Sequence, residues 1–201
     1  MSGAGQVPFV GLTGGVGSGK STALAALEEL GAATLSADAV VHELLGSEEM
    51  RDAIVSRFGS DVLGADGAIE RSAVAERVFG QAEDRSWLEG LLWPRVGARI
   101  VEWRAEVDAS EALPPAAVVE VPLLFESGMD SVFDTTIAVV ADEPLRAERA
   151  YARGHTAVAE RVGRQLTQQE KADRAGYVVR NDGTREELKA ELSHVLATIE
   201  D

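Results

Sequence analysis

The chain has 201 residues, and its apolar fraction of 45% is enough for the core of one ordinary domain, which we expect to extend over residues 1–201. Thirty-four acidic residues against 19 basic ones give a formal net charge of −15, so we expect no binding to nucleic acid or to an anionic membrane surface. Cysteine is absent, which excludes disulfides, thiolate nucleophiles and cysteine-based metal sites.

No segment contains the run of about 18 apolar residues that a membrane-spanning helix needs, and the first residues do not resemble a secretory signal. We therefore expect a cytoplasmic protein. Nothing resembles the seam of a coiled coil, so we expect a monomer. The three histidines, His42, His155 and His194, lack the spacing of a ligand pair, and we predict no structural zinc site.

Short apolar runs rich in β-branched residues predict the strands of a buried parallel sheet. The runs are Pro8–Leu12, Ala33–Leu35, Ala116–Val121, Thr135–Val140 and Tyr177–Val179. The segments between them are long enough for crossover helices, which indicates a layered α/β fold. Roughly eighty residues separate the second run from the third, so we expect a helical region of several segments there.

Other local patterns predict helices and their ends. The longest helical pattern covers Ser86–Val107, and we expect Pro94 to kink it. Capping boxes are predicted at Thr167–Glu170 and Thr184–Glu187, where a hydroxyl and a carboxylate satisfy each other's backbone N–H groups. The arginine-rich insertion 149–175 has the composition of a mobile lid over a phosphate site.

One motif carries the chemistry. Residues Gly14 to Ser21 read Gly-Gly-Val-Gly-Ser-Gly-Lys-Ser and match the phosphate-binding P-loop pattern G-x-x-x-x-G-K-[ST] between a predicted strand and a predicted helix. Its glycines let successive backbone N–H groups turn towards a phosphate, and the helix amino terminus adds positive potential. Lys20 would bridge the β- and γ-phosphates, and the Ser21 hydroxyl would ligate Mg²⁺. The alternative is a glycine-rich turn that binds no nucleotide, but this would not explain the presence of Lys20 in a chain with so few lysines.

A P-loop predicts a nucleoside triphosphate but not a reaction. The chain lacks the Asn-Lys-x-Asp tetrapeptide with which GTPases read guanine, so we favour a small kinase. A kinase needs a carboxylate to orient or deprotonate the acceptor hydroxyl. Asp38 is our candidate because it follows the second predicted strand, at the sheet edge where ligands collect. It could equally be the N-cap of a helix over Ala39–Leu45.

Two further features suit phosphoryl transfer. Glu120 lies at the end of the apolar strand Ala117–Val119, where P-loop enzymes often keep an acid that holds Mg²⁺ through water; the alternative is an edge or strand-end carboxylate without a ligand. Arg146, Arg149 and Arg153 recur at three- and four-residue spacing and therefore share a helix face. That face is either solvated and paired with acids or, as we interpret it, part of a lid that closes over ATP.

The chain then matches a known family pattern over nearly its whole length. The matching segments are Val10–Thr22, Ala37-Asp38, Phe58-Gly59, Asp66-Gly67, Arg71, Leu91-Leu92 before Pro94, Val121–Glu126, Arg149, Arg153, Gln165, Asn181 and Gly183. In these segments the chain resembles the dephospho-CoA kinases. The P-loop is common to many NTPases, whereas Pro-Leu-Leu-Phe-Glu together with it is specific to this family.

The resemblance implies an α/β P-loop NTPase fold of three layers with a parallel five-stranded sheet, a helical substrate-binding region and a small lid. The core would comprise 8–37, 111–148 and 176–201, with the acceptor-binding region over 38–110 and the lid over 149–175. The implied reaction is phosphorylation of the ribose 3′-hydroxyl of dephospho-CoA by MgATP, which yields coenzyme A and ADP in the last step of coenzyme A synthesis.

The resemblance also implies residue roles. Asp38, Lys20 and Arg149 would act in catalysis, with Asp38 as the general base. ATP would be bound by Gly15, Val16, Gly17, Ser18, Gly19, Lys20, Ser21, Thr22, Arg149, Arg153 and Asn181. Dephospho-CoA would contact Thr13, Asp38, Arg71, Leu123, Phe125 and Glu126, and Mg²⁺ would be held by Ser21 and Glu120.

Three positions depart from the family pattern. Ser36 replaces a carboxylate beside Asp38 but can still form hydrogen bonds, and Trp93 replaces a histidine and any acceptor contact of that ring. Gly176, in place of an aspartate, is interpreted as a helix C-cap. The open alternatives are a nucleoside monophosphate kinase or another small-metabolite kinase, and a nucleotide-binding regulatory protein without transfer activity.

Overall fold

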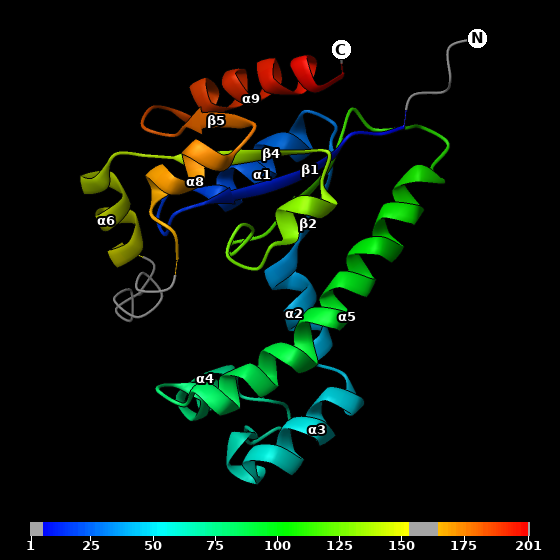
Figure 1. Ribbon diagram of the computed structural model, residues 1–201, viewed down its shortest axis with the longest axis vertical. Coiled ribbons are helices and arrows are strands. Elements are labelled where there is room, and N and C mark those ends of the chain that lie inside the picture. Colours follow the sequence, from blue (N-terminus) through cyan, green and yellow to red (C-terminus); the bar gives the residue numbers. More distant parts are fainter. Residues whose placement is uncertain (1–5, 153–164, 201) are drawn as a thin grey trace. The chain divides into compact units, whose positions relative to one another are not determined.

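The computed structural model describes residues 6–152 and 165–200, which fall into two compact units (Figure 1). The first unit contains the chain up to Ser36 and from Arg104 onwards, and the second contains Ala37–Trp103. The division follows from the sequence, because the long insertion after the second strand has enough apolar residues to form a core of its own.

The first unit is built on a parallel sheet with the strand order β2-β3-β1-β4-β5. The strands are β1 (Phe9–Gly14), β2 (Ala33–Ser36), β3 (Ala117–Glu120), β4 (Thr135–Val140) and β5 (Tyr177–Arg180). The central strand β1 pairs with β3 and β4, so that Leu12 lies in register with Glu120 and with Ile137. The predicted five-stranded parallel sheet is confirmed, and its carboxyl ends share one edge.

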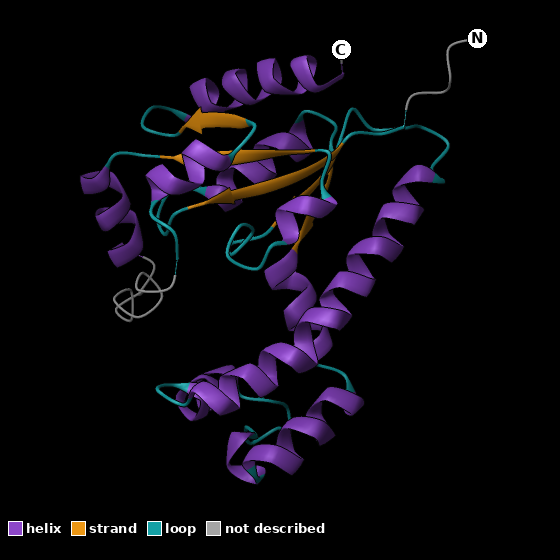
Figure 2. Cartoon of the chain, in the orientation of Figure 1, coloured by secondary structure: helices purple, strands orange, loops and turns teal. Residues whose placement is uncertain are grey.

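Helices cover both faces of this sheet and give the expected three layers (Figure 2). They are α1 (Lys20–Glu29), α8 (Gln168–Arg174) and α9 (Arg185–Glu200). The unit also contains α6 (Glu143–Ala152), which follows β4, and the 3-10 turn η2 (Met129–Val132). The apolar sides of α1 and α9 pack on Val10 and Leu12. On the other face Gly11 makes room for the Phe133 ring, and α8 contacts β1 and β4.

The second unit is helical, as expected for the long insertion. It contains α2 (Ala37–Leu45), α3 (Glu48–Phe58), the turn η1 (Ser60–Val62), α4 (Arg71–Val78) and most of α5 (Ala82–Asp108). Met50 and Ile54 of α3 form the centre of its core. The rings of Phe58 and Trp87 meet edge to face with centroids 5.4 Å apart, which fastens α3 to α5.

Some local predictions need correction. The helix α2 begins at Ala37, so Asp38 lies inside its first turn and is not the N-cap of a helix that starts at Ala39. The C-cap of α8 is Ala175, and Gly176 has a different role: a Cβ there would lie 2.5 Å from the Thr135 hydroxyl of β4. Gly176 therefore permits a close approach between two chain segments. The helix α5 contains Pro94 and continues on both sides of it, and the kink expected there stays a prediction.

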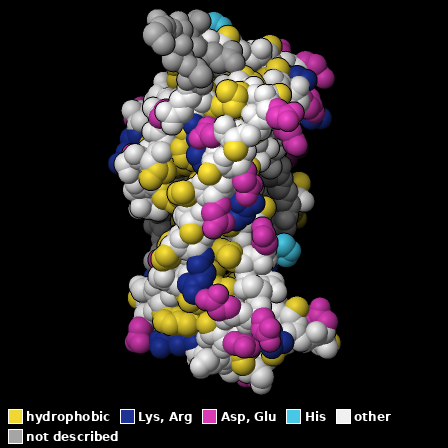
Figure 3. Space-filling view, turned by 90° about the vertical axis from the view of Figure 1, so that its right-hand side faces the viewer, with side chains coloured by type: hydrophobic (Ala, Val, Ile, Leu, Met, Phe, Trp, Pro, Cys, Tyr) yellow, Lys and Arg dark blue, Asp and Glu magenta, His cyan; other side chains and the backbone are white. Residues whose placement is uncertain are grey.

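The acidic residues are spread out and often paired. Figure 3 shows aspartate and glutamate side chains scattered over one face among lysines and arginines. Arg57, for example, contacts Glu83 and Asp84 at 3.1 and 2.7 Å. In the described part of the chain, no helix combines the length and the apolar character needed to cross a membrane.

Both predicted capping boxes are present. The Thr167 hydroxyl accepts a hydrogen bond from the Glu170 backbone N–H at 3.2 Å, and the Glu170 carboxylate accepts one from the Thr167 N–H at 2.7 Å. Thr184 and Glu187 form the same pair at the start of α9. The hydroxyl and backbone hydrogen bonds of Thr167 hold the pKa of Glu170 below its ordinary value.

Glu170→Gln should weaken the pH dependence of stability. Because folding depresses the pKa of Glu170, its carboxylate stabilises the fold above the unfolded-state pKa of about 4.3, and this contribution is lost as the pH falls through the folded-state pKa. Urea-unfolding midpoints should therefore differ between wild type and variant near neutral pH and converge in acid. A difference of equal size at both pH values would contradict this role.

Candidate active site

The predicted P-loop connects β1 to α1, which is the context that the motif requires. Gly17 and Gly19 have positive φ angles of 77° and 91°, in the region that favours glycine. A Cβ on Gly17 would collide with the backbone of Arg146, and one on Gly19 would collide with the amide of Asn181. Close approach by neighbouring segments therefore requires glycine at both positions, apart from any demand of a phosphate.

Side chains from two other elements hold the loop. The Asn181 Nδ2 donates to the Ser18 carbonyl at 2.8 Å, and the Arg149 side chain donates to the Asn181 carbonyl at 2.9 Å. The Arg146 Nε donates to the Val16 carbonyl at 3.1 Å. The structure thus joins two of the predicted ATP contacts, Arg149 and Asn181, to the loop itself.

Arg146 was predicted only as part of the helix face that closes over ATP, without a contact of its own. The available signal was its three-residue spacing from Arg149, which places both on one face of α6. A neighbouring carboxylate, Glu143, pairs with its guanidinium at 2.6 Å. Arg153, the third arginine of that face, lies outside the described residues.

The loop has the features of an anion site. The Lys20 ammonium lies 3.1 Å from the Gly14 carbonyl and 3.2 Å from the Gly15 carbonyl, at the point where the loop leaves β1. Ser21 is exposed and Thr22 half-buried in the first turn of α1, whose amino end carries positive potential. Backbone N–H groups, a lysine and a helix amino end together suit a phosphate.

A second oxygen donor lies beside this loop. Glu120 is the last residue of β3, is only 8% exposed and is in register with Leu12 of β1. The Glu120 carboxylate and the Ser21 hydroxyl are hard oxygen donors of the kind that Mg²⁺ prefers. Among the described residues no three His, Asp or Glu side chains gather as a metal site. The chemistry of the two oxygen donors fits Mg²⁺, which is usually held by one or two protein groups together with water and substrate phosphates.

The predicted acceptor contacts of the first unit lie near the end of β1 and after β3. Thr13 is fully buried, and its hydroxyl donates to the Pro122 carbonyl at 3.3 Å. Leu123 is half-buried. Phe125 is 5% exposed, with the Arg174 guanidinium 5.1 Å from its ring centroid. The segment from Pro122 to Glu126 is thus ordered by its own packing.

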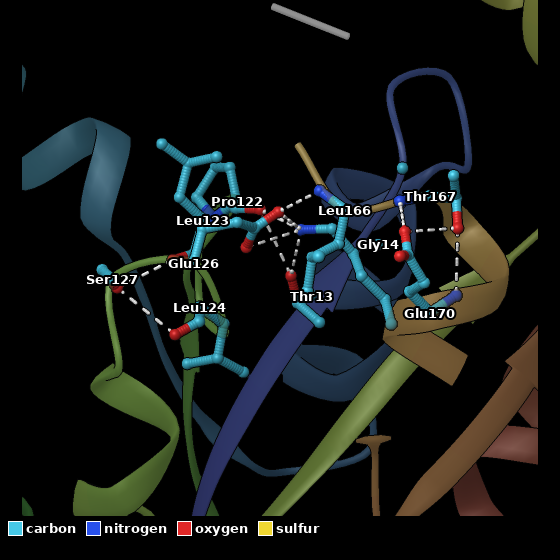
Figure 4. A network of polar contacts seen from close by, with 12 residues as sticks. Thr13, Gly14, Pro122, Leu123, Leu124, Glu126, Ser127, Leu166, Thr167 and Glu170 are labelled. Atoms are coloured by element: carbon cyan, nitrogen blue, oxygen red, sulfur yellow. Dashed lines mark hydrogen bonds and ion pairs between the residues drawn. The ribbon is translucent and has the colours of Figure 1, made fainter. Parts of the chain in front are cut away.

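Glu126 forms a buried ion pair with Lys171, a residue absent from the predicted site (Figure 4). The Lys171 ammonium lies 2.9 Å from the Glu126 Oε1 and donates to the Pro122 carbonyl at 2.7 Å. Burial lowers the pKa of Lys171, and the hydrogen bond and charge of Glu126 oppose this shift. The rarity of lysine in this chain was the only signal in the sequence.

Two predicted residues belong to the second unit. Asp38 lies exposed in the first turn of α2, and chain connectivity keeps it two residues beyond Ser36, the end of β2. Arg71 is exposed and opens α4. Both side chains are accessible to a ligand.

A central parallel strand that leads through a glycine-rich loop and Lys20 into a helix defines a P-loop nucleotide-binding protein. The family model for dephospho-CoA kinase matches residues 8–187. The chain belongs to the dephospho-CoA kinase family, as the sequence motifs predicted.

Individual relatives agree. The dephospho-CoA kinase of Protochlamydia amoebophila is 40% identical over 187 residues, which cover 91% of this chain and 92% of that protein. The one from Symbiobacterium thermophilum is 37% identical over 188 residues, with 92% and 78% covered. A crystal structure from Thermus thermophilus matches with a TM-score of 0.80 at 32% identity and covers 96% of this chain and 98% of its own.

The fold also agrees with more distant structures. The dephospho-CoA kinase from Campylobacter jejuni has a TM-score of 0.66 at 23% identity, with 97% of this chain and 98% of that chain covered. A shikimate kinase from Bacteroides thetaiotaomicron has a TM-score of 0.52 at 12% identity, with 96% and 99% covered. The predicted P-loop kinase fold is confirmed.

Asn181→Ala should weaken ATP binding about tenfold, because the buried Ser18 carbonyl loses its hydrogen-bond donor and the P-loop loses the side chain that holds it at this point. Titration with a non-hydrolysable ATP analogue measures the change. Gln169→Ala, which removes an exposed side-chain amide on α8, is the matched control and should leave the affinity unchanged. Equal affinities for wild type and Asn181→Ala would show that the loop holds its shape alone.

Proposed function

We propose that this chain transfers the γ-phosphoryl group of ATP to the ribose 3′-hydroxyl of dephospho-CoA and releases coenzyme A and ADP. The match of the family model over residues 8–187 carries this proposal, together with a P-loop complete in Lys20 and Ser21. Both curated relatives described above bear the name of this activity.

On the donor side, the backbone N–H groups from Gly15 to Gly19 and the Lys20 ammonium would hold the β- and γ-phosphates. Arg149 would neutralise charge on the transferring group, with its guanidinium already anchored on the Asn181 carbonyl. Ser21 and Glu120 would hold Mg²⁺, which supplies further neutralisation of the phosphate oxygens. Each of these residues belongs to the first unit.

On the acceptor side, Asp38 would take the proton of the ribose 3′-hydroxyl. That oxygen forms a bond to the γ-phosphorus while the bond to the β–γ bridging oxygen breaks, so ADP leaves with the bond electrons. Asp38 is exposed and needs no rearrangement of its own element to receive a proton. Arg71, Thr13 and the segment from Leu123 to Glu126 would contact the acceptor.

We further propose that the protein works in the cytoplasm as a monomer without nucleic-acid partners. The absence of cysteine suits a reducing compartment, where disulfides contribute nothing. The net charge of −15 disfavours contact with polyanions.

Incubation of the pure protein with MgATP and dephospho-CoA should yield coenzyme A and ADP in equal amounts, as chromatography with mass detection would show. ADP without coenzyme A would overturn the proposal. Stimulation of ADP release by a nucleoside monophosphate or another small metabolite, and not by dephospho-CoA, would indicate the related kinase. ATP binding without turnover for any acceptor would indicate a regulatory protein.

Asp38→Asn should lower kcat by about 10²- to 10⁴-fold while the affinity for ATP is retained, because only the proton acceptor is lost. Steady-state kinetics and an ATP titration separate the two effects. Asp52→Asn, at an exposed aspartate of α3, is the matched control and should keep the wild-type kcat. An unchanged kcat in Asp38→Asn would remove Asp38 from the catalytic step.

A further inference from the structure

A single buried ammonium group joins three chain segments that are far apart in the sequence (Figure 4). Lys171 of α8 donates to the Pro122 carbonyl at 2.7 Å, pairs with the Glu126 carboxylate at 2.9 Å and lies 3.5 Å from the Thr13 hydroxyl oxygen. Its side chain is fully buried. An ammonium group has three N–H donors, and four oxygen atoms lie within reach of them, because the second Glu126 oxygen is 3.2 Å away.

The three segments border the phosphate loop. Thr13 immediately precedes Gly14, where the loop motif begins, and Pro122 lies two residues after Glu120, the proposed metal carboxylate. Lys171 therefore spans the carboxyl ends of β1 and β3. One turn earlier on α8, the Gln168 amide forms two hydrogen bonds of 2.9 Å to the backbone of Ala141, just after β4.

The ion pair also has a purely structural interpretation, in which it only fills the space between α8 and the sheet. Buried ion pairs contribute little net stability compared with a well-packed apolar pair, because the desolvation of both charges offsets their attraction. An apolar pair, however, could not donate hydrogen bonds to the neighbouring oxygen atoms. Since an ammonium only donates, a hydrogen bond between Lys171 and Thr13 can run only from Lys171 to the hydroxyl oxygen, and the Thr13 proton is then directed to the Pro122 carbonyl.

We propose that Lys171 is a positioning residue of the phosphoryl-transfer site. It holds the segment from Pro122 to Glu126 and the Thr13 hydroxyl at a set distance from the P-loop, so that Glu120 and the acceptor-binding segment are aligned with the γ-phosphate. Glu126 holds the ammonium in place through two oxygens, one of which also accepts from the Leu166 N–H at 2.8 Å. This inference rests on the proposed function.

The first test is Lys171→Met, which keeps the length of the side chain and removes its charge. We expect kcat for coenzyme A formation to fall about tenfold or more, because small displacements of reacting groups are costly, while the Kd of an ATP analogue changes by less than about twofold. Lys189→Met is the matched control, since Lys189 is also ion-paired, to Glu29, but lies at the surface of α9. It should keep the wild-type kcat.

A second pair of variants separates positioning from stability. Lys171→Met leaves Glu126 as a buried unpaired charge, whereas Lys171→Met combined with Glu126→Gln removes both charges and keeps an oxygen for the Leu166 N–H. We expect the double variant to regain most of the lost thermal stability and to keep the low kcat. Glu126→Gln alone should lose less kcat, because Lys171 still reaches Pro122 and Thr13.

Recovery of kcat in the double variant, or a loss in Glu126→Gln equal to that of the double variant, would overturn the role of Lys171. A wild-type kcat in Lys171→Met would also overturn it. These results differ from failure of the proposed function, in which the wild-type protein itself forms no coenzyme A. If Lys171→Met does not fold, the kcat values of Glu126→Gln and of the double variant are compared with each other, and a lower kcat in the double variant supports the role of Lys171.

Chemical rescue gives an independent readout. Because the chain has no cysteine, Lys171→Cys creates a single thiol, which can be aminoethylated in the denatured state to give a side chain that closely resembles lysine. After refolding, the aminoethylated protein should regain kcat relative to the same variant blocked with an uncharged reagent of similar size. Wild-type protein taken through the same cycle is the control. Equal kcat for the charged and uncharged adducts would contradict the proposal.

Discussion

A loop that points its backbone N–H groups at a phosphate must turn its carbonyls away, and these carbonyls then need donors of their own. In this protein the Arg146 side chain donates a hydrogen bond to the Val16 carbonyl, and the Asn181 side chain donates one to the Ser18 carbonyl. The donors approach so closely that Gly17 and Gly19 cannot carry a Cβ. The phosphate site is therefore built jointly by the loop, by α6 and by the segment after β5. Contacts within the protein that hold the loop reduce the cost of ordering it when a ligand binds.

Local positive groups at the P-loop explain how a protein with a negative net charge can bind anionic substrates. Several of the acidic side chains are paired with arginines, as Glu83 and Asp84 are with Arg57. Exposed charges beyond about 10 Å are largely screened by salt, whereas groups inside a crevice are screened much less. Lys20 and Arg149, held beside the loop by the Gly14 and Asn181 carbonyls, are the cations that we propose contact the phosphates. The net charge of −15 acts on solubility and on contacts with large polyanions.

Short-range patterns in the sequence predicted a large part of the fold. The five strands, the P-loop between β1 and α1 and both capping boxes are correct because each depends on residues close together in the chain. The helical nature of the long insertion followed from its length. The predicted start of α2 was wrong because the sequence has no separate capping signal before Ala37. The predicted role of Gly176 was wrong because the lack of a side chain there is required by the close approach of Thr135 in β4.

By itself, therefore, the sequence determined the class of site: a P-loop with one well-placed lysine, followed by motifs specific to a kinase family. Only the tertiary structure decided which side chains support that site. Lys171 meets Thr13 across 158 positions of the chain, and Asn181 meets Ser18 across 163. Contacts of this kind leave no periodic trace in the sequence, because they depend on the sheet bringing the carboxyl ends of distant strands to one edge.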